Sequence, residues 1–382
     1  MIGPLAWGLL FIGTLLGRQR MSRLSRWRRK LPDNPPSVSI LIPAKDEGPG
    51  INRCIEAVLA QDHPKFDVIT IDDRSTDDTG QILDGIAARD PRVKAVHIPL
   101  DGLPPGWLGK CHALHVGARQ AAGDWLFFVD SDVTLDPNAL SSALSICLGR
   151  QYDALSILTR LECHSSLERF MLPPLAAAWA IMHAVSLTNQ DSRPDRAAAN
   201  GQFFLIRRDA YEKVGGHEAV KDQITEDVEM MRLLKSHEYR VRLFSGAHLA
   251  ATRMHSNLKQ MFNGWARIYS GTPRRKPWRI LWVIFFLATA VFSLYPAIGW
   301  GIYKLASQHD PRWIYACASH FILMTGYLAF IYHWSGGSKI RYALMIPVTA
   351  TIMIAILLYS LRKCQTGKIV WRDTVFAPAQ KQ

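Results

Sequence analysis

The sequence predicts an α/β protein with a mostly parallel sheet, helices on both faces of it, and membrane-spanning helices at both ends of the chain. Two observations predict this fold class. Apolar runs of strand length alternate with segments of helical spacing between residues 35 and 275, and long stretches without charged residues lie outside that region. The composition agrees: 48% of the 382 residues are hydrophobic and 20% are charged, with a mean hydropathy of +0.01. This hydropathy excludes a disordered chain.

Four apolar runs in the central region have the length of β-strands. Continuous apolar runs are typical of strands buried on both faces, and four successive strand–helix units imply a parallel sheet. The predicted strands are Val38–Ala44, Phe66–Ile71, Val93–Ile98 and Trp125–Val129. The helices that follow them are Ile51–Gln61, a helix capped by Thr76 or Asp77 that runs to Ala88, Lys110–Ala122, and a helix from Pro137.

Three uncharged stretches in the second half of the chain are long enough to cross a bilayer. Ile280–Tyr303, Trp313–Trp334 and Tyr342–Leu361 hold 24, 22 and 20 residues, and about 20 residues cross the hydrocarbon core. Tryptophans lie near the ends of these stretches, as is typical of membrane interfaces. We therefore expect three transmembrane helices within residues 280–361, followed by a basic tail over residues 362–382.

Two further apolar runs need separate interpretations. Residues 1–17 lack charge, and the positive charge follows them, which predicts an uncleaved N-terminal transmembrane anchor rather than a secretory signal. Residues 18–34 would be a basic juxtamembrane linker. The run Phe170–Thr188 contains Pro173 and Pro174. We interpret it as an in-plane or core helix rather than as a span.

Positive charge is concentrated beside the apolar runs. The net charge is +13, and Arg18–Lys30 alone has seven basic and no acidic residues. Further basic clusters lie at residues 274–279 and in the tail, so the central region is close to neutral and nucleic acid is not an expected partner. Basic flanks predict that residues 35–275 lie in the cytoplasm, on a plasma (inner) membrane. Three spans would then put the basic tail outside, so either one run does not cross or the tail departs from the positive-inside trend.

Acidic clusters follow three of the predicted strands. Asp46 and Glu47 follow the first, Asp72 and Asp73 the second, and Asp130-Ser131-Asp132 the fourth. Ligands of parallel sheets bind beyond the carboxyl ends of the strands. Such carboxylates suit a divalent cation, Mg²⁺ or Mn²⁺, and the hydroxyls of a sugar or ribose. The alternative is solvated loop acids. The chain lacks the glycine-rich motifs of dinucleotide-binding and P-loop proteins.

These clusters, together with Pro43 and Thr225-Glu226-Asp227, resemble in order and spacing the inverting family 2 glycosyltransferases of GT-A fold. The resemblance covers roughly residues 35–275. Further motifs narrow it to a membrane-bound subgroup associated with hopanoid and carotenoid biosynthesis. They are Gly106-Trp107-x-Gly109-Lys110, Gly201–Tyr211, Gly215-Gly216-His217 and Gly264-Trp265.

The resemblance implies a role for each matching residue. Asp130 and Asp132 would hold a sugar diphosphate through the metal, with Asp132 as the direct ligand. Asp227 would be the catalytic base, with Glu226 as the second candidate. The family opening usually has Asn where this chain has Asp46. The donor-binding residues, for a nucleotide-sugar such as a UDP-sugar, would be Pro43, Ala44, Asp46, Glu47, Asp73, Lys110, Asp130, Ser131, Asp132, Gly201, His217 and Arg267.

The chemistry asks for the same residue types. Displacing a nucleoside diphosphate from an anomeric carbon develops charge on the leaving phosphate, which a divalent metal offsets. An attacking hydroxyl needs a carboxylate to take its proton. Asp227 begins a predicted helix, Asp227–Glu238, where the positive helix end favours its charge, and Thr225 offers the cap. The predicted helix Asn257–Tyr269 would be interfacial.

We therefore predict a hexosyltransferase that moves a sugar to a membrane lipid, of hopanoid, carotenoid or other polyisoprenoid type, at the cytoplasmic face. A processive polysaccharide synthase is the first alternative. It is disfavoured because Asn263-Gly264-Trp265-x-Arg267 stands where Gln-x-x-Arg-Trp is expected. A non-catalytic membrane scaffold is the second, disfavoured by the retention of all four acidic motifs. The sugar, the lipid and the oligomeric state stay open.

Overall fold

The computed structural model describes residues 3–20, 30–48, 50–183, 185–254, 257–271, 277–334, 339–366, 369–371 and 374–376. The chain forms two units. Residues 21–162 and 184–254 make up the first, called here the sheet unit. Residues 1–20, 163–183 and 255–382 make up the second, called the helical unit. The sequence predicted one domain over residues 35–275. In the structure, two segments of that range, 163–183 and 255–275, group with the apolar helices.

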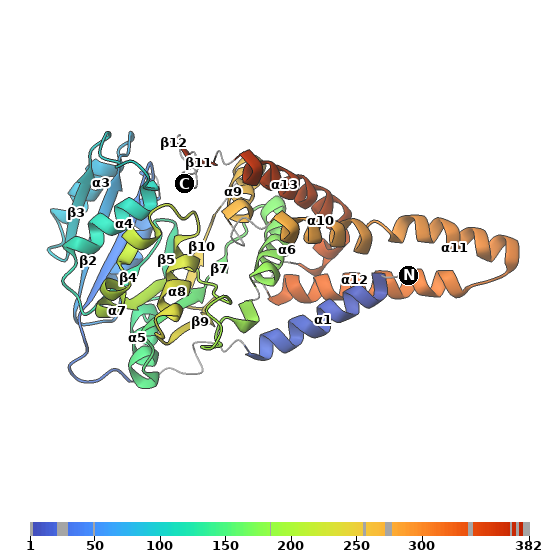
Figure 1. Ribbon diagram of the computed structural model, residues 1–382, viewed down its shortest axis with the longest axis horizontal. Helices are drawn as coiled ribbons and strands as arrows, with labels where there is room; N and C mark the ends of the chain where they lie inside the picture. Colours follow the sequence, from blue (N-terminus) through green and yellow to red (C-terminus); the bar gives the residue numbers. More distant parts are fainter. Residues whose placement is uncertain are drawn as a thin grey trace. The chain divides into compact units, whose positions relative to one another are not determined.

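A seven-stranded sheet forms the centre of the sheet unit (Figure 1). Its strand order is β3-β2-β1-β4-β8-β6-β9. β1 pairs in parallel with β2 and β4, β2 with β3, and β6 with β9, whereas β8 is antiparallel to both of its neighbours. The predicted mostly parallel sheet is thus confirmed. The strands are β1 Val38–Ala44, β2 Phe66–Asp73, β3 Val93–Ile98, β4 Trp125–Phe128, β6 Ala154–Leu158, β8 Phe204–Arg207 and β9 Val241–Ser245.

Helices pack on both faces of this sheet. Alternate residues of a strand point to opposite faces, and the core divides accordingly. Ile40 and Phe127 belong to the cluster formed with α2 and α5, while Leu41 and Phe128 belong to the cluster formed with α4 and α8. The helical elements of the sheet unit are α2 Ile51–Leu59, α3 Thr79–Ala87, α4 Gly109–Gln120, α5 Ala139–Arg150, η2 Val185–Leu187, α7 Arg208–Lys213, η3 Gly216–Val220 and α8 Glu226–Ser236.

Neither predicted cap, Thr76 or Asp77, is the N-cap residue of the second helix. α3 begins at Thr79 after the N-cap residue Asp78. Asp77 instead accepts a hydrogen bond of 3.0 Å from the backbone N–H of Thr79, and Thr76 donates to Asp46. The N–H of Thr79 has no acceptor within α3, so Asp77 still satisfies one of the free donors of the first turn.

A second, three-stranded sheet has the order β5-β10-β7. β10 is antiparallel to β5 and parallel to β7, and Thr252 pairs with Val133. This pairing brings Thr252 beside the turn that contains Asp132. The strands are β5 Val133–Leu135, β7 Arg160–Leu161 and β10 Ala250–Thr252.

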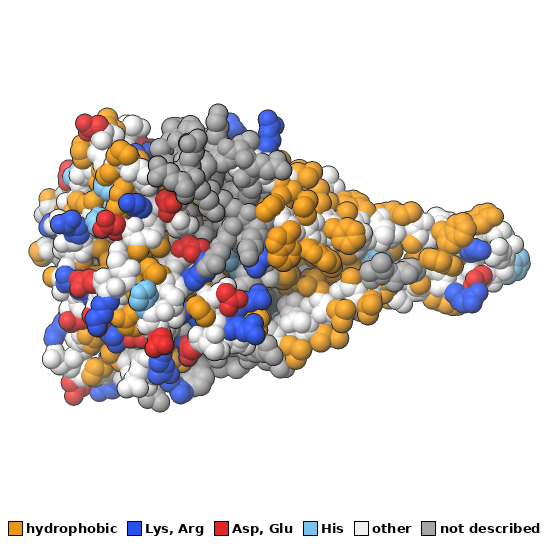
Figure 2. All heavy atoms as spheres, in the orientation of Figure 1, with side chains coloured by type: hydrophobic (Ala, Val, Ile, Leu, Met, Phe, Trp, Pro, Cys, Tyr) orange, Lys and Arg blue, Asp and Glu red, His pale blue; other side chains and the backbone are white. Residues whose placement is uncertain are grey.

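The helical unit contains the membrane-length helices. Pro277–Gln308, Arg312–His333 and Ile340–Lys363 are long and apolar enough to cross a bilayer, and their exposed side chains are mostly hydrophobic (Figure 2). The predicted spans lie within them, apart from Trp334 at the end of the second. The elements are α1 Gly3–Arg20, α6 Ser166–Met182, α9 Leu258–Gly271, α10 Pro277–Ala290, α11 Leu294–Gln308, α12 Arg312–Trp334, η4 Ile340–Met345, α13 Ile346–Thr366, β11 Ile369–Trp371 and β12 Thr374–Phe376.

The N-terminal anchor stays a prediction. The apolar part of α1, Gly3–Gly17, is shorter than the three other stretches. At 1.5 Å per residue it would extend for roughly 22 Å, less than the thickness of about 30 Å of the hydrocarbon core.

The first predicted span consists of two helices rather than one. α10 ends at Ala290 and α11 begins at Leu294. Pro296 lacks the N–H that would bond to Phe292, and the N–H of Tyr295 donates to that carbonyl instead, at 3.3 Å. The freed carbonyl of Ala290 lies 2.7 Å from Nε1 of Trp7 and from Nε2 of His320.

The ambiguous run Phe170–Thr188 covers most of α6, which begins at Ser166, and then η2, which belongs to the sheet unit. Pro173 and Pro174 lie inside α6 and leave earlier carbonyls of the helix without their usual donors. The hydroxyl of Tyr332, on α12, donates to the carbonyl of Phe170 at 2.7 Å. A capping box between Ser165 and Glu168 begins the helix. α6 packs against α9, α12 and α13, so it is a core helix of the helical unit.

Candidate active site

The carboxyl ends of β1, β2 and β4 lie next to one another, because the three strands are parallel neighbours in the sheet. Pro43 and Ala44 end β1 and pair with Ile71 and Asp72 of β2. The three acidic clusters therefore meet at this edge, as the sequence predicted.

Asp46 joins the end of β1 to the turn after β2. Its backbone has a φ of +52°, a left-handed conformation that Asp tolerates better than most residues. Its N–H donates to Oγ of Ser75 at 3.0 Å, and its Oδ1 accepts from the N–H of Thr76 at 2.8 Å. The next N–H, of Glu47, donates to Oγ1 of Thr79 at 2.9 Å. An Asn side chain would accept the same bonds at Oδ1, so they do not require a charge at residue 46.

Asp73 is held by the residue that follows it. Both carboxylate oxygens accept from the guanidinium of Arg74, at 2.8 and 3.1 Å. Gly109 lies against this pair: a Cβ there would be 2.6 Å from Oδ2 of Asp73 and 2.5 Å from Nη2 of Arg74. Gly109 therefore allows the N-terminus of α4 to approach the end of β2 closely. The sequence indicated no role for Arg74.

Lys110 connects two of the acidic clusters. Its Nζ lies 2.7 Å from Oδ1 of Asp130 and 2.8 Å from Oε1 of Glu226. Burial alone would lower the pKa of Lys110, but the two carboxylates raise it well above its usual value. The side chain is therefore a fixed positive charge between the turn after β4 and the start of α8.

Asp227 accepts two backbone hydrogen bonds. The N–H of Gly201 donates to Oδ2 at 2.6 Å, and that of Val228 to Oδ1 at 2.8 Å. Burial and the adjacent Glu226 raise the pKa of Asp227 to about 7, against the lowering effect of Lys110 and of these bonds. A carboxylate that titrates near neutral pH suits general-base catalysis.

Gly201 is the point on which these charged groups converge. A Cβ on Gly201 would lie 3.2 Å from Nζ of Lys110 and 3.4 Å from both Asp227 and Glu226. Glu226 and Asp227 begin α8, which starts one residue earlier than predicted, at Glu226. The side chain of Thr225 makes no capping bond. Thr225 thus occupies the predicted N-cap position without the capping bond, and Asp227 accepts an N–H of the first turn instead.

Asp130, Ser131 and Asp132 form the turn between β4 and β5. Packing of protein atoms around Asp132, together with the negative Asp130 and Glu47, raises the pKa of Asp132 to about 7, while a hydrogen bond from Thr252 lowers it. The Asp132 side chain is nevertheless exposed to solvent. We therefore attribute the direction of this shift mainly to repulsion between the carboxylates.

Asp130 and Asp132 fit a divalent cation. Carboxylate oxygens are the ligands that Mg²⁺ prefers in proteins, usually one or two of them together with phosphates and water. Within the part of the chain that the structure describes, no three His, Cys, Asp or Glu side chains form a metal-binding group. The two aspartates alone are the number of ligands expected at a site that a sugar diphosphate completes. A cation there would also relieve the repulsion at Asp132.

Two other predicted donor-binding residues, His217 and Arg267, do not join these charged clusters. His217 is buried, its Nδ1 lies 2.8 Å from the hydroxyl of Tyr211, and its ring packs edge-on against Phe128. Burial and Lys110 lower the pKa of His217 to about 3, so its ring is neutral. Arg267 belongs to α9 of the helical unit and is not among the residues that the sheet unit brings together.

A polar network behind the site was not predicted. Nε2 of Gln202 lies 3.3 Å from Oγ1 of Thr252, and Oε1 of Gln202 accepts from Thr159 at 2.6 Å and from Asn200 at 3.3 Å. Because Thr252 also bonds to Asp132, the network runs from the turn between β4 and β5 to the segment of Gly201. The members of this network come from three separate parts of the chain. Nothing in the sequence indicated a role for Gln202 except its position after Gly201.

The family model described as "Glycosyltransferase like family 2" matches residues 35–271 of this chain. The chain belongs to glycosyltransferase family 2. The match covers the predicted domain almost from end to end and includes every acidic cluster described above. The predicted family is thus confirmed.

Similar proteins agree with this assignment of a glycosyltransferase. The 4,4'-diaponeurosporenoate glycosyltransferase of Staphylococcus haemolyticus is 25% identical over 293 residues, 75% of each chain. The protein of the same name from Staphylococcus aureus is 25% identical over 268 residues, 68% of each chain. Among solved structures, the mannosyltransferase PcManGT of Pyrobaculum calidifontis matches with a TM-score of 0.57 and 18% identity, over 96% of this glycosyltransferase and 100% of that chain. This likeness confirms the GT-A fold.

Proposed function

We propose that this glycosyltransferase moves a hexose from a nucleotide-diphospho-sugar, a UDP-sugar, to a membrane lipid with inversion at the anomeric carbon. One observation carries the proposal. The carboxylate of Asp227, with a pKa near neutrality, lies at the same place as the Lys110–Asp130 pair, around Gly201. A base and a phosphate-binding charge cluster are the two parts that such a transfer needs.

The donor would be bound at the edge formed by β1, β2 and β4. Glu47, Asp73 and the turn around Asp46 would contact the base and ribose. Asp130 and Asp132 would hold a divalent cation, Mg²⁺ or Mn²⁺, which offsets the charge on the leaving diphosphate when bound. A solved relative of this fold is described in complex with GDP-Man and Mn²⁺, which supports a metal-bound nucleotide-sugar.

Asp227 would act as the general base. The acceptor oxygen forms a bond to the anomeric carbon, the bond from that carbon to the diphosphate breaks, and the hydroxyl proton passes to Asp227. A single displacement of this kind inverts the configuration. Glu226 is paired with Lys110, at 2.8 Å, which makes it the weaker candidate for the base.

Two observations support a lipid acceptor. Among the residues that the structure describes, three helices have membrane length. The similar proteins of staphylococci are named for a diaponeurosporenoate, a carotenoid carboxylate. We therefore propose an acceptor of polyisoprenoid type, such as a carotenoid or hopanoid, glycosylated at the cytoplasmic face of the plasma (inner) membrane.

The test is transfer by the full-length protein in lipid nanodiscs. UDP- and GDP-sugars are offered with Mn²⁺ to a polyisoprenoid alcohol and to a polyisoprenoid acid, and the products are identified by mass spectrometry. We expect one sugar per lipid, with the anomeric configuration opposite to that of the donor by NMR. A polymer would instead indicate a processive synthase, and donor binding without transfer to either lipid would indicate a scaffold.

A further inference from the structure

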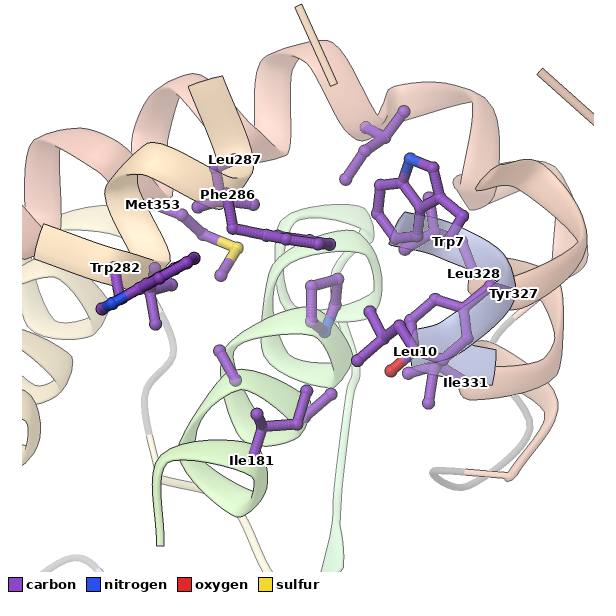
Figure 3. Close-up of a pocket in the computed structure, with 15 residues that line it drawn as sticks. Trp7, Leu10, Ile181, Trp282, Phe286, Leu287, Tyr327, Leu328, Ile331 and Met353 are labelled. Atoms are coloured by element: carbon purple, nitrogen blue, oxygen red, sulfur yellow. The ribbon is translucent and has the colours of Figure 1, made fainter. Parts of the chain in front are cut away.

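The helical unit contains a cavity of about 250 Å³ that the proposed chemistry does not use (Figure 3). Side chains from five helices line it. They include Trp7 of α1, Ile181 of α6, Trp282 and Phe286 of α10, Ile331 of α12 and Met353 of α13. All five helices belong to one unit, so the cavity is formed within a single packed body.

The lining of this cavity is almost wholly apolar, and none of its residues is charged. The polar atoms of two buried lining residues are engaged within the protein. Nε1 of Trp7 donates to the carbonyl of Ala290 at 2.7 Å, and the hydroxyl of Tyr327 lies 3.4 Å from Oγ1 of Thr14. The floor of the cavity therefore offers an occupant no hydrogen bond, which selects a hydrocarbon group and disfavours water.

The size of the cavity also points to an occupant. Apolar cavities of about 150 Å³ stay dry and bind molecules such as benzene, and this one is larger. An empty cavity costs stability in proportion to its volume, because the atoms around it lose their packing partners. A hydrocarbon chain would restore those contacts.

The exposure of the lining residues indicates where the occupant enters. Ile181 and Trp282 are 49% and 62% exposed, whereas Trp7, Met353 and Ile331 are at most 3% exposed. The mouth is thus between α6 and α10. α10 belongs to a stretch of membrane length whose outward side chains are hydrophobic, so the mouth opens toward the lipid phase.

The helix at the mouth is continuous in sequence with the catalytic region at both of its ends. α6 follows β7, whose partner strand β10 contains Thr252, the hydrogen-bond partner of Asp132. The chain that leaves α6 runs through η2 to Gly201, which bonds to Asp227. This connectivity favours the acceptor as the occupant over an unrelated membrane lipid.

We propose that this cavity binds the hydrocarbon chain of the lipid acceptor. The inference rests on the proposed function for the identity of the lipid, and it assigns to α1, α6, α10, α12 and α13 the task of selecting that lipid by its chain. Long polyisoprenoid chains without polar groups fit the lining. Acceptors with a short chain would not reach the floor and would bind weakly.

The first test is photolabelling of the full-length protein in nanodiscs by a polyisoprenyl alcohol that carries a diazirine near the end of its chain. No sugar donor is added, so the result does not depend on transfer. We expect labelled peptides from α6, α10 or α12 in the wild type, and at least tenfold less labelling in Ala178→Trp, where the added ring would fill the cavity. The control is Ala288→Trp, which adds the same ring on the exposed face of α10, outside the lining.

If Ala178→Trp does not fold, Ile181→Trp at the exposed mouth replaces it and should reduce labelling in the same way. Equal labelling of wild type and folded cavity variants would overturn the proposal, as would loss of labelling when excess phosphatidylglycerol is added, because the cavity would then be a general lipid site.

A kinetic measurement separates the cavity from the proposed function. In Ala178→Trp we expect the KM for a long-chain acceptor to rise at least tenfold, with kcat and donor affinity within twofold of the wild type. The KM for a water-soluble, short-chain acceptor should not change. An unchanged KM for the long-chain acceptor would contradict the proposal, whereas a wild type that labels but transfers no sugar would contradict only the proposed function.

Discussion

The ammonium group of Lys110 lies 2.7 Å from the carboxylate of Asp130. The same group lies 2.8 Å from Glu226, so one positive charge holds the turn after β4 to the start of α8. All three side chains are at most about a quarter exposed, and their interaction is therefore only partly screened by water.

Replacing Lys110 should destabilise the metal-free protein. In Lys110→Gln, two carboxylates lose their counter-charge, which costs about 3–5 kcal/mol for a fully buried pair. Because these groups keep some solvent contact, we expect about 2 kcal/mol, a fall in thermal midpoint of roughly 4–8 °C. Tryptophan fluorescence in detergent measures it. The exposed Lys94→Gln should shift the midpoint by less than about 2 °C, and equal midpoints for the two variants would show that the pair contributes no stability.

The carboxylate cluster predicts an unusual dependence of stability on pH. The pKa of Asp132 is raised to about 7 from an ordinary value of 3.8, so between these pH values the folded protein holds a proton that the unfolded chain has released. The contribution of Asp132 to stability must therefore fall as pH rises from about 4 to about 7, and stay constant above that.

The measurement compares wild type with Asp132→Asn in EDTA. The variant lacks this titration but keeps that of His217, whose lowered pKa acts in the opposite direction. The difference in thermal midpoint, wild type minus variant, should decrease from pH 4 to pH 7, and added Mn²⁺ should reduce the decrease. A difference that is constant over this range would show that repulsion between the carboxylates does not raise the pKa of Asp132.

Thr252 should tune metal binding without touching the metal. Its hydroxyl bonds to Asp132 and lies 3.3 Å from Gln202. Partners of metal ligands typically contribute 10–100-fold in affinity, so Thr252→Val should weaken Mn²⁺-dependent binding of UDP by about that factor. Asp132→Ala should abolish this Mn²⁺-dependent binding. Isothermal titration calorimetry measures both variants. Thr70→Val, a buried threonine of β2, should leave affinity within twofold; a similar loss there would point to a general packing effect.

A chain cut to residues 31–271 should not behave as an independent soluble domain. Its strands are complete, but α6 and α9 would lose partners from the removed helices. Tyr332 bonds to Phe170, and Ser360 bonds to Ala266 at 3.0 Å. We expect the truncated chain to self-associate in buffer, by size-exclusion chromatography, and to become monodisperse with detergent. A monodisperse fragment without detergent would support the domain boundary near residue 275 that the sequence predicted.

The strands could be predicted because their pattern reports burial directly. Val38–Ala44 is apolar throughout and is buried on both faces of the sheet, and the observed strand has the predicted bounds. Pattern is less informative where side chains compete for the backbone. Asp46 accepts the N–H of Thr76, and Asp77 accepts that of Thr79, the first residue of α3, so this helix starts two or three residues after the predicted caps.

Partners distant in sequence could not be predicted at all. An apolar stripe on α9 or α6 shows that one face is buried, but it does not name the element that covers it, and both helices group with the apolar helices. The same holds for the site. The acidic motifs located the edge of the sheet, whereas the pairing of Lys110 with Glu226 depends on where α4 and α8 pack.

Asp227 is proposed to remove the proton from a hydroxyl acceptor. Asp227→Asn keeps one oxygen that can accept the N–H of Gly201, but the N–H of Val228 then loses its acceptor, so the start of α8 keeps one of these two bonds. The variant cannot serve as the base, and kcat with a polyisoprenoid alcohol should fall by about 10²–10⁴. The donor affinity should stay within twofold, because other clusters hold the donor. A carboxylate acceptor, already ionised, should be affected much less.

The most direct test is therefore kcat for both acceptors in wild type, Asp227→Asn and the exposed control Asp222→Asn, with donor affinity measured alongside. We expect a loss of kcat of at least a hundredfold, confined to Asp227→Asn and to the hydroxyl acceptor. Turnover of the alcohol by Asp227→Asn at the wild-type rate would contradict it.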